Sequence, residues 1–215
     1  MKSGILFALA GTLLDTLEDL RDSVNFALDS FGFPPRTLEE VRQFVGNGAE
    51  QLIRLAVPEG TDAALVPQVL GTFRQHYATN CRNKTRPYPG IMDALKALGK
   101  EYPIAIVSNK PDSAVKDLCA LYFPGVFALG ESADSPRKPA PDMVYKAMKA
   151  IDVEKCVYVG DSEVDVRTAR NANVPCLSVL WGFRDREVLE AEGAEYFCET
   201  GESLPAVIGK ITETL

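Results

Sequence analysis

The spacing of hydrophobic positions changes along the chain, and each change predicts a different kind of element. The run from Ile5 to Phe7 is apolar, too short for a helix and suited to a buried strand. Gly11 and Thr12 then supply turn chemistry, so the strand should end before them. Beyond Asp15, apolar residues recur at helical spacing, and no convincing strand falls between residues 16 and 82. This pattern predicts helices over 17–32, 38–45, 49–57 and 61–80.

From residue 91 onward, short apolar runs alternate with amphipathic segments. The runs predict strands over 104–107, 126–129, 157–159, 176–180 and 195–198. The segments between them predict helices over 91–98, 113–121, 141–151, 164–172 and 186–192, and one from 203. Such alternation is typical of a doubly wound parallel sheet. We therefore expect an α/β, Rossmann-like core domain of residues 1–15 and 83–215, with a helical cap domain of residues 16–82 inserted after the first strand.

Composition narrows the choice of partners. The net charge is −7 and no run of lysine or arginine occurs, which argues against nucleic acid and anionic membrane surfaces. No apolar run reaches the length of a membrane span. The chain has five cysteines, an odd number, and they are widely spaced. This favours reduced thiols over a disulfide framework or a zinc site. We expect a cytoplasmic protein, as a monomer or a dimer.

Two aspartates follow the predicted strand 157–159. Asp161 stands directly after its end, and Asp165 comes four residues later, one turn up the next helix and on the same side. Two carboxylates directed at one place suit Mg²⁺, which prefers oxygen ligands. The alternative is structural: Asp161 as the N-cap of the helix, with acidic residues in its first turn. The residues alone leave both interpretations open.

Three further positions could hold a phosphate. Ser108 ends the predicted strand 104–107, and its hydroxyl and the following backbone N–H groups could bind an anion at a helix start. Lys138 lies in a proline-rich loop, 135–142, whose stiffness lowers the entropy of presenting an ammonium group. Thr12 could donate its hydroxyl. The structural alternatives are a helix cap for Ser108, a solvated surface loop around Lys138, and a simple turn at Thr12.

Together these pieces resemble the haloacid dehalogenase superfamily of phosphotransferases, over nearly the whole chain. Residues 5–16 resemble its first motif, Ser108 its second and Lys138 its third. Gly160 and Asp161, with Asp165, resemble its fourth. The nearest likeness is to phosphoglycolate-phosphatase-like members, through the Val-Gly-Asn-Gly run of residues 45–48 and the Pro-Tyr-Pro-Gly run of residues 87–90.

The chain departs from this family at two positions. The family has aspartate where this sequence has Ala8 and Ala10. The resemblance implies that the first aspartate attacks phosphorus, forms an aspartyl phosphate and ligates Mg²⁺. It implies that the second protonates the leaving oxygen and then activates water, while its backbone carbonyl ligates the metal. An alanine side chain can do neither job, so we predict a chain without meaningful turnover and with weakened Mg²⁺ binding.

The resemblance also assigns the remaining site residues. Phosphate would be held by Thr12, Ser108, Asn109 and Lys138. Mg²⁺ would be held by Asp161 and the Ala10 carbonyl, with Asp165 behind them. In the cap, the candidates for contacting substrate are Gly46, Asn47, Arg42 and Arg54. Either arginine could instead be an ordinary solvated helix residue.

Two hypotheses of different kinds follow. The first is a phosphatase of small phosphorylated metabolites, phosphoglycolate-like, whose two catalytic carboxylates were deliberately replaced by alanine. Pyrophosphate and sugar phosphates are alternative substrates. The second is a natural non-catalytic binding or regulatory protein of the same fold. The second hypothesis would not need Lys138 or Asp165, yet the chain has both.

Overall fold

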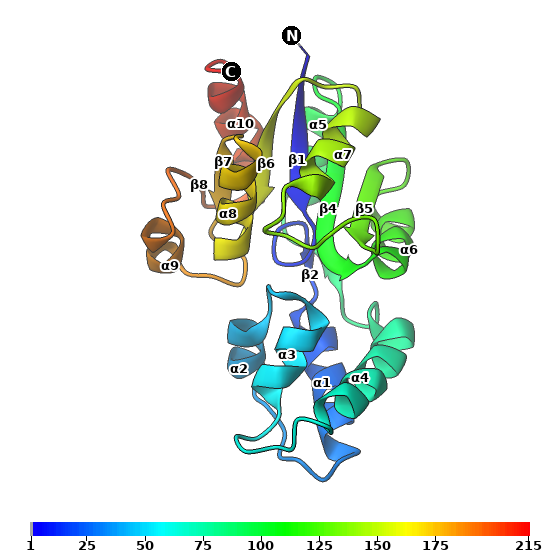
Figure 1. The fold of residues 1–215 in the computed structure, drawn as a ribbon. Helices are drawn as coiled ribbons and strands as arrows, with labels where there is room; N and C mark the ends of the chain where they lie inside the picture. The colour runs from blue at the N-terminus through cyan, green and yellow to red at the C-terminus, as the bar shows by residue number, and fades with distance from the viewer. Residues whose placement is uncertain (1) are drawn as a thin grey trace. The chain divides into compact units, whose positions relative to one another are not determined.

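A computed structural model describes residues 2–215 and divides them into two compact units (Figure 1). Residues 2–14 and 87–215 form an α/β unit, and residues 15–86 form a helical unit. The sequence predicts these boundaries after residues 15 and 82. The return boundary lies later because the backbone N–H groups of Lys84 and Thr85 donate to the Asp19 carboxylate, at 2.8–3.0 Å, and so belong with the first helix of the helical unit.

The α/β unit is built on a parallel sheet, as the alternating pattern predicted. Within residues 2–215 the sheet has six strands in the order β5-β4-β1-β6-β7-β8. Their bounds are β1 Ser3–Ala8, β4 Ile104–Pro111, β5 Phe127–Glu131, β6 Lys155–Gly160, β7 Cys176–Val179 and β8 Tyr196–Cys198. Strand β1 lies between β4 and β6, with Ile5 beside Ile104 and Val157. The carboxyl ends of these three strands therefore meet where the order of the strands reverses, the usual ligand position in such sheets.

Helices cover both faces of this sheet, which gives the doubly wound architecture that was predicted. They are α5 Ile91–Leu98, α6 Asp112–Tyr122, α7 Asp142–Ala150, α8 Glu163–Ala172, α9 Arg186–Ala191 and α10 Leu204–Thr212, with a short 3₁₀ turn, η1, at Gly201–Ser203. Helices α7 and α8 lie in front of the sheet in Figure 1. Leu6 and Tyr158 contribute to the apolar cluster on that side. Their strand neighbours Ile5 and Val157 are also fully buried, as expected of a sheet covered on both faces.

The helical unit contains α1 Leu17–Asp29, α2 Leu38–Phe44, α3 Gly48–Ala56 and α4 Val66–Asn80. The prediction that the last helix begins at residue 61 was wrong. The Asp62 carboxylate accepts the Ala64 N–H at 2.9 Å, which holds a turn there. Pro67 stands in the first turn of α4, where its missing N–H costs nothing, whereas one turn further inside it would break the helix.

The two connections between the units were not predicted as strands. Leu14–Asp15 forms β2 and Arg86–Pro87 forms β3, and the two pair as a separate two-stranded sheet. Two residues are too few to show a period of two in the sequence. Strand β4 also runs to Pro111 rather than stopping at Val107. Among residues 2–215, no helix combines the length and the apolar character needed to cross a bilayer.

Candidate active site at the ends of three parallel strands

The loop that leaves β1 folds back tightly on β6. Ala8, the last residue of β1, is buried, and the Gly11 N–H donates to the Leu14 carbonyl at 2.9 Å. Gly11 has φ +80°, and a Cβ there would lie 2.1 Å from an Asp161 carboxylate oxygen. Only glycine therefore allows this approach. Thr12, next in the chain, is fully buried and donates its hydroxyl to Asp161 Oδ1 at 2.7 Å.

The two aspartates after β6 do different jobs. Asp165 Oδ2 accepts the Asp161 N–H, the Ser162 N–H and the Ser162 hydroxyl at 2.7–3.1 Å. Ser162, not Asp161, is the N-cap of α8, so the cap interpretation of Asp161 was wrong. The Asp161 carboxylate instead accepts the Thr12 hydroxyl and the Phe183 N–H, at 2.7 and 3.0 Å. Asp165 therefore orders the start of the helix, whereas Asp161 joins three loops.

Lys138 is buried and paired, so the interpretation of its loop as solvated was wrong for this residue. Its ammonium donates to Asp165 Oδ1 at 2.7 Å, with both side chains less than a tenth exposed. Asn109 holds its backbone from the other side, accepting the Lys138 N–H at 2.6 Å and donating to the Lys138 carbonyl at 3.0 Å. Arg137, its neighbour, is exposed. Hydrogen bonds thus run from Thr12 to Asp161, and from Asp165 through Lys138 to Asn109.

Ser108 lies beside this cluster but does not cap a helix. It is buried within β4, and its oxygen accepts the Lys110 N–H at 3.2 Å. Helix α6 begins at Asp112, with Pro111 as its N-cap. The cap interpretation of Ser108 was therefore wrong, and a phosphate at Ser108 would be separated from the start of α6. A hydroxyl both accepts and donates, so the Ser108 hydroxyl can still donate its hydrogen to an anion.

Burial and charge separate the protonation behaviour of the two aspartates. Burial, and then the nearby Asp165 charge, raise the pKa of Asp161 to about 7, against the opposing Phe183 N–H, Thr12 hydroxyl and Lys138 charge. Burial would raise the pKa of Asp165 too, but the Lys138 ammonium and the hydrogen bonds to the carboxylate outweigh it and hold this pKa below its ordinary value. Asp165 is therefore the fixed charge of the cluster, and Asp161 is the group that can take up a proton.

The segment after β7 contributes contacts that the sequence analysis missed. The Trp181 indole N–H donates to the Thr12 carbonyl at 3.0 Å, and the Phe183 N–H reaches Asp161. Between them, a Cβ on Gly182 would lie 2.3 Å from the Asp161 Cβ. The signal that could have found this segment is its place, directly beyond the carboxyl end of a strand of the same sheet.

The candidates in the helical unit form contacts of their own. Gly46 has φ +130°, and Asn47 is the N-cap of α3. Arg42 pairs with Glu39 at 3.6 Å, and Arg54 pairs with Glu50 at 2.8 Å. Arg54 lies in the last turn of α3, about 9 Å along the helix from Gly48 at 1.5 Å per residue.

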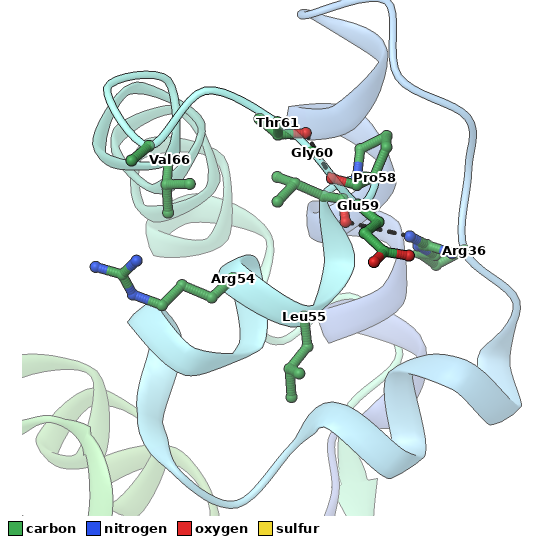
Figure 2. Close-up of a pocket in the computed structure, with 10 residues that line it drawn as sticks. Arg36, Arg54, Leu55, Pro58, Glu59, Gly60, Thr61 and Val66 are labelled. Atoms are coloured by element: carbon green, nitrogen blue, oxygen red, sulfur yellow. Dashed lines mark hydrogen bonds between the residues drawn. The ribbon is translucent and has the colours of Figure 1, made fainter.

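Arg54 lines a hollow of about 440 Å³ in the helical unit, together with Arg36, Leu55, Val57, Pro58, Glu59, Gly60, Thr61, Ala63 and Val66. Figure 2 shows the two arginines on different sides of it. Arg36 donates to the carbonyls of Ala56 and Val57, at 2.7 and 3.3 Å. These carbonyls belong to the C-terminal end of α3, where they lack partners within the helix, so Arg36 supplies their hydrogen bonds.

A parallel sheet with a charged cluster at the switch point and a helical insertion after its first strand is the arrangement that the resemblance to haloacid dehalogenase-like hydrolases led us to expect. The sequence model of the family described as haloacid dehalogenase-like hydrolase matches residues 5–179, and the chain belongs to that family.

Its relatives include phosphoglycolate phosphatases. That of Pseudomonas putida is 35% identical and aligns with 87% of this chain and 73% of its own length. That of Mesorhizobium japonicum is 34% identical, with 87% of each chain covered. A solved structure from Lactobacillus delbrueckii subsp. bulgaricus, described as a predicted phosphoglycolate phosphatase, has a TM-score of 0.91 and 37% identity over 97% of this chain and 100% of its own. By family, this chain is a phosphatase hydrolase.

Phosphatases of this family generally use Mg²⁺, and the residues present here leave a resident ion few protein oxygen ligands. Residues 2–215 contain no group of three or more His, Cys, Asp or Glu side chains that could hold a metal. Both oxygens of Asp165 are occupied by hydrogen bonds, one of them from a lysine ammonium. Asp161 and the Ala10 carbonyl are left to hold Mg²⁺. One carboxylate is the fewest with which Mg²⁺ is usually bound, with substrate phosphates completing its shell, so these residues fit a weakly held ion.

Proposed function

We propose that this chain binds small phosphorylated metabolites at the ends of β1, β4 and β6 and does not hydrolyse them. By lineage it derives from a phosphatase of phosphoglycolate-like monoesters that forms an aspartyl phosphate with the help of Mg²⁺. The observation that carries the proposal is a buried, ordered cluster of Thr12, Asp161, Asp165 and Lys138 beside a strand whose end has Ala8 and Ala10.

Phosphate binding is supported by the donors that converge on this place. An ammonium has three N–H donors, and among the residues that the structure describes, Lys138 directs two of them to Asp165 and Tyr158. One donor is left for an anion. Ser108 and Asn109 lie on the adjoining strand β4, and Asn109 is hydrogen-bonded to the backbone of Lys138. A phosphate dianion would thus meet the Lys138 ammonium and the Ser108 hydroxyl, two side chains that are both buried.

The absence of turnover follows from the two alanines. Covalent phosphoryl transfer needs a nucleophile that can carry the phosphoryl group, and a methyl group cannot. Loss of a general acid–base group alone typically costs about a hundredfold to ten-thousandfold in rate. The two losses are not additive because the groups act in one sequence of steps. We expect no hydrolysis above the uncatalysed rate.

The test restores the carboxylates. The double variant Ala8→Asp with Ala10→Asp is assayed with Mg²⁺ on phosphoglycolate, sugar phosphates, nucleotides and pyrophosphate, beside the parent chain. Ala8→Asn with Ala10→Asn is the matched control, because it restores side-chain volume without charge. We expect activity in the aspartate variant alone, with phosphoglycolate or a similarly small monoester preferred.

The alternative function, a natural non-catalytic binder, gives a different result. The aspartate variant would then bind phosphate, as the parent does, and still hydrolyse none of these substrates. A parent chain that fails to bind inorganic phosphate in calorimetric titration would contradict both functions. Purified parent chain with a Mg²⁺-dependent phosphatase rate would contradict the proposal directly.

A further inference from the structure

Tyr158 was not among the candidate site residues, yet its hydroxyl lies inside the charged cluster. The Tyr158 oxygen accepts a hydrogen bond from the Lys138 ammonium at 3.1 Å and donates one to Asp165 Oδ1, also at 3.1 Å. Lys138 donates to the same Asp165 oxygen at 2.7 Å. Three side chains from three segments therefore close a ring of hydrogen bonds, and the phenol is its only uncharged member.

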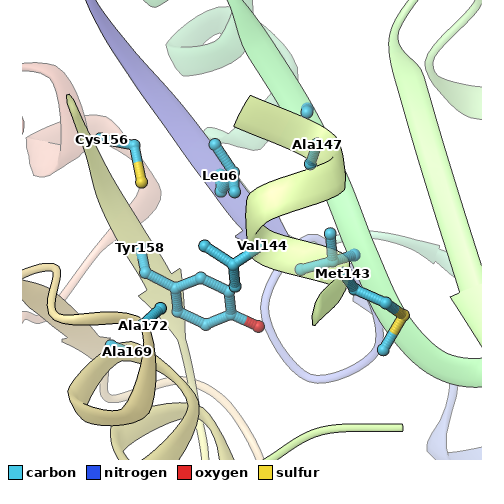
Figure 3. Packing of buried hydrophobic residues seen from close by; sticks show 10 residues of the cluster. Leu6, Met143, Val144, Ala147, Cys156, Tyr158, Ala169 and Ala172 are labelled. Carbon is cyan, nitrogen blue, oxygen red and sulfur yellow. The ribbon is translucent and has the colours of Figure 1, made fainter. Parts of the chain in front are cut away.

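The ring of Tyr158 is held rigidly. It is fully buried in the apolar cluster between the sheet and helices α7 and α8. Figure 3 shows it lying between Val144 and Ala169, with the hydroxyl at its far end. Because side chains in such a core are close-packed, the phenol oxygen cannot move toward or away from Lys138. The phenol oxygen of Tyr158 is therefore a hydrogen-bonding group in a fixed position at strand β6.

The Lys138 ammonium needs a second, rigid hydrogen-bond acceptor if its orientation is to be fixed. Asn109 holds its backbone, but a lysine side chain has four rotatable carbons and a freely turning ammonium. A single contact with Asp165 would leave the other two N–H groups free to rotate about the Nζ–Oδ1 axis. A second, rigid acceptor removes that rotation and fixes the direction of the third N–H.

We propose that Tyr158 is a positioning residue, which orients the Lys138 ammonium so that its third N–H faces a bound phosphoryl group. This inference rests on the proposed function, because it assigns Lys138 to phosphate binding. The phenol suits the task because it accepts and donates at once. Burial, with the Asp165 charge, raises the pKa of Tyr158 well above its ordinary value, so the hydroxyl keeps its proton.

The experiment removes the hydroxyl alone. Tyr158→Phe is compared with the parent chain by calorimetric titration with inorganic phosphate, and by the rate at which acetic anhydride acylates Lys138, followed by mass spectrometry. Tyr102→Phe is the matched control, because the Tyr102 hydroxyl makes a hydrogen bond of 3.0 Å to Thr212, remote from the cluster. Urea unfolding of both variants measures the purely structural cost.

We expect Tyr158→Phe to weaken phosphate binding about fivefold to tenfold, the worth of one ordinary hydrogen bond. Acylation of Lys138 should become several-fold faster, because the ammonium is less firmly held. Tyr102→Phe should change neither quantity. Unchanged acylation in Tyr158→Phe overturns the inference, and so does unchanged phosphate affinity. If the parent chain binds no phosphate, the proposed function fails, and the acylation rate still decides the role of Tyr158.

Discussion

Replacing Lys138 with methionine should destabilise the fold through Asp165 rather than through lost packing. Methionine keeps most of the apolar stem of lysine and removes the ammonium. The Asp165 carboxylate then remains 2% exposed without its counter-charge. Removing one partner of a buried ion pair typically costs about 3–5 kcal/mol, because the remaining charge is desolvated and unpaired.

The structure places this substitution toward the low end of that range. Asp165 keeps the Ser162 hydroxyl, two backbone N–H groups and the Tyr158 hydroxyl as donors. We expect a loss of about 3 kcal/mol in the free energy of unfolding at pH 7. The cost should depend on pH. Lys138 helps to hold the pKa of Asp165 below its ordinary value. The stability that this ion pair contributes is therefore present above the pKa of Asp165 in the unfolded chain, and it is lost as the pH falls through the lower pKa of Asp165 in the folded chain.

Urea unfolding at several pH values checks this. The matched control is Lys116→Met, because Lys116 is 63% exposed and pairs with Asp112 on the surface, where such pairs are worth about 1 kcal/mol or less. A double variant with Asp165→Asn should recover much of the loss. If Lys138→Met costs no more than the control at pH 7, or if its cost grows on acidification, the reasoning about a buried, unpaired carboxylate is refuted.

Three further outcomes follow from the same cluster. Asp161→Asn, measured in EDTA, should stabilise the chain by about 2 kcal/mol at pH 8, because it removes a buried negative charge. The upper limit is about 4 kcal/mol, which is the free energy that corresponds to raising the pKa of Asp161 from 3.8 to about 7. The gain should shrink as the pH falls toward 4, where the folded carboxyl is already protonated; thermal unfolding that shows no gain at pH 8 would contradict this. Gly11→Ala should cost about 2–4 kcal/mol in urea unfolding, because of the positive φ and the approach to Asp161, whereas Gly209→Ala, with open space around it, should not. Ala8→Asp should tighten Mg²⁺ binding by at least about tenfold in calorimetry, because it adds an oxygen ligand; equal affinities would count against weakened metal binding in the parent chain.

Much of the architecture was predictable because it is written in local periodicity. The parallel sheet follows from short continuous apolar runs, and the inserted helices follow from apolar residues that recur every three to four positions. The errors fell where periodicity carries no information. One was the start of α4, which Pro67 sets. The others were the two-residue strands β2 and β3, and the last residues of β4, Ser108 to Pro111.

The candidate site divides in the same way. The amino-acid sequence alone shows which residues stand at strand ends, and that Ala8 and Ala10 remove two carboxylates from one of these ends. Which of these residues contact one another depends on the folded arrangement of distant segments. Thr12 reaches Asp161 across 149 positions, and Trp181 reaches Thr12 across 169. Tyr158 reads in the sequence as an ordinary core residue, and its hydroxyl gains a role only because Lys138 and Asp165 arrive beside it. The order of strands in the sheet sets these meetings, and that order is a property of packing between distant segments, which no local pattern encodes.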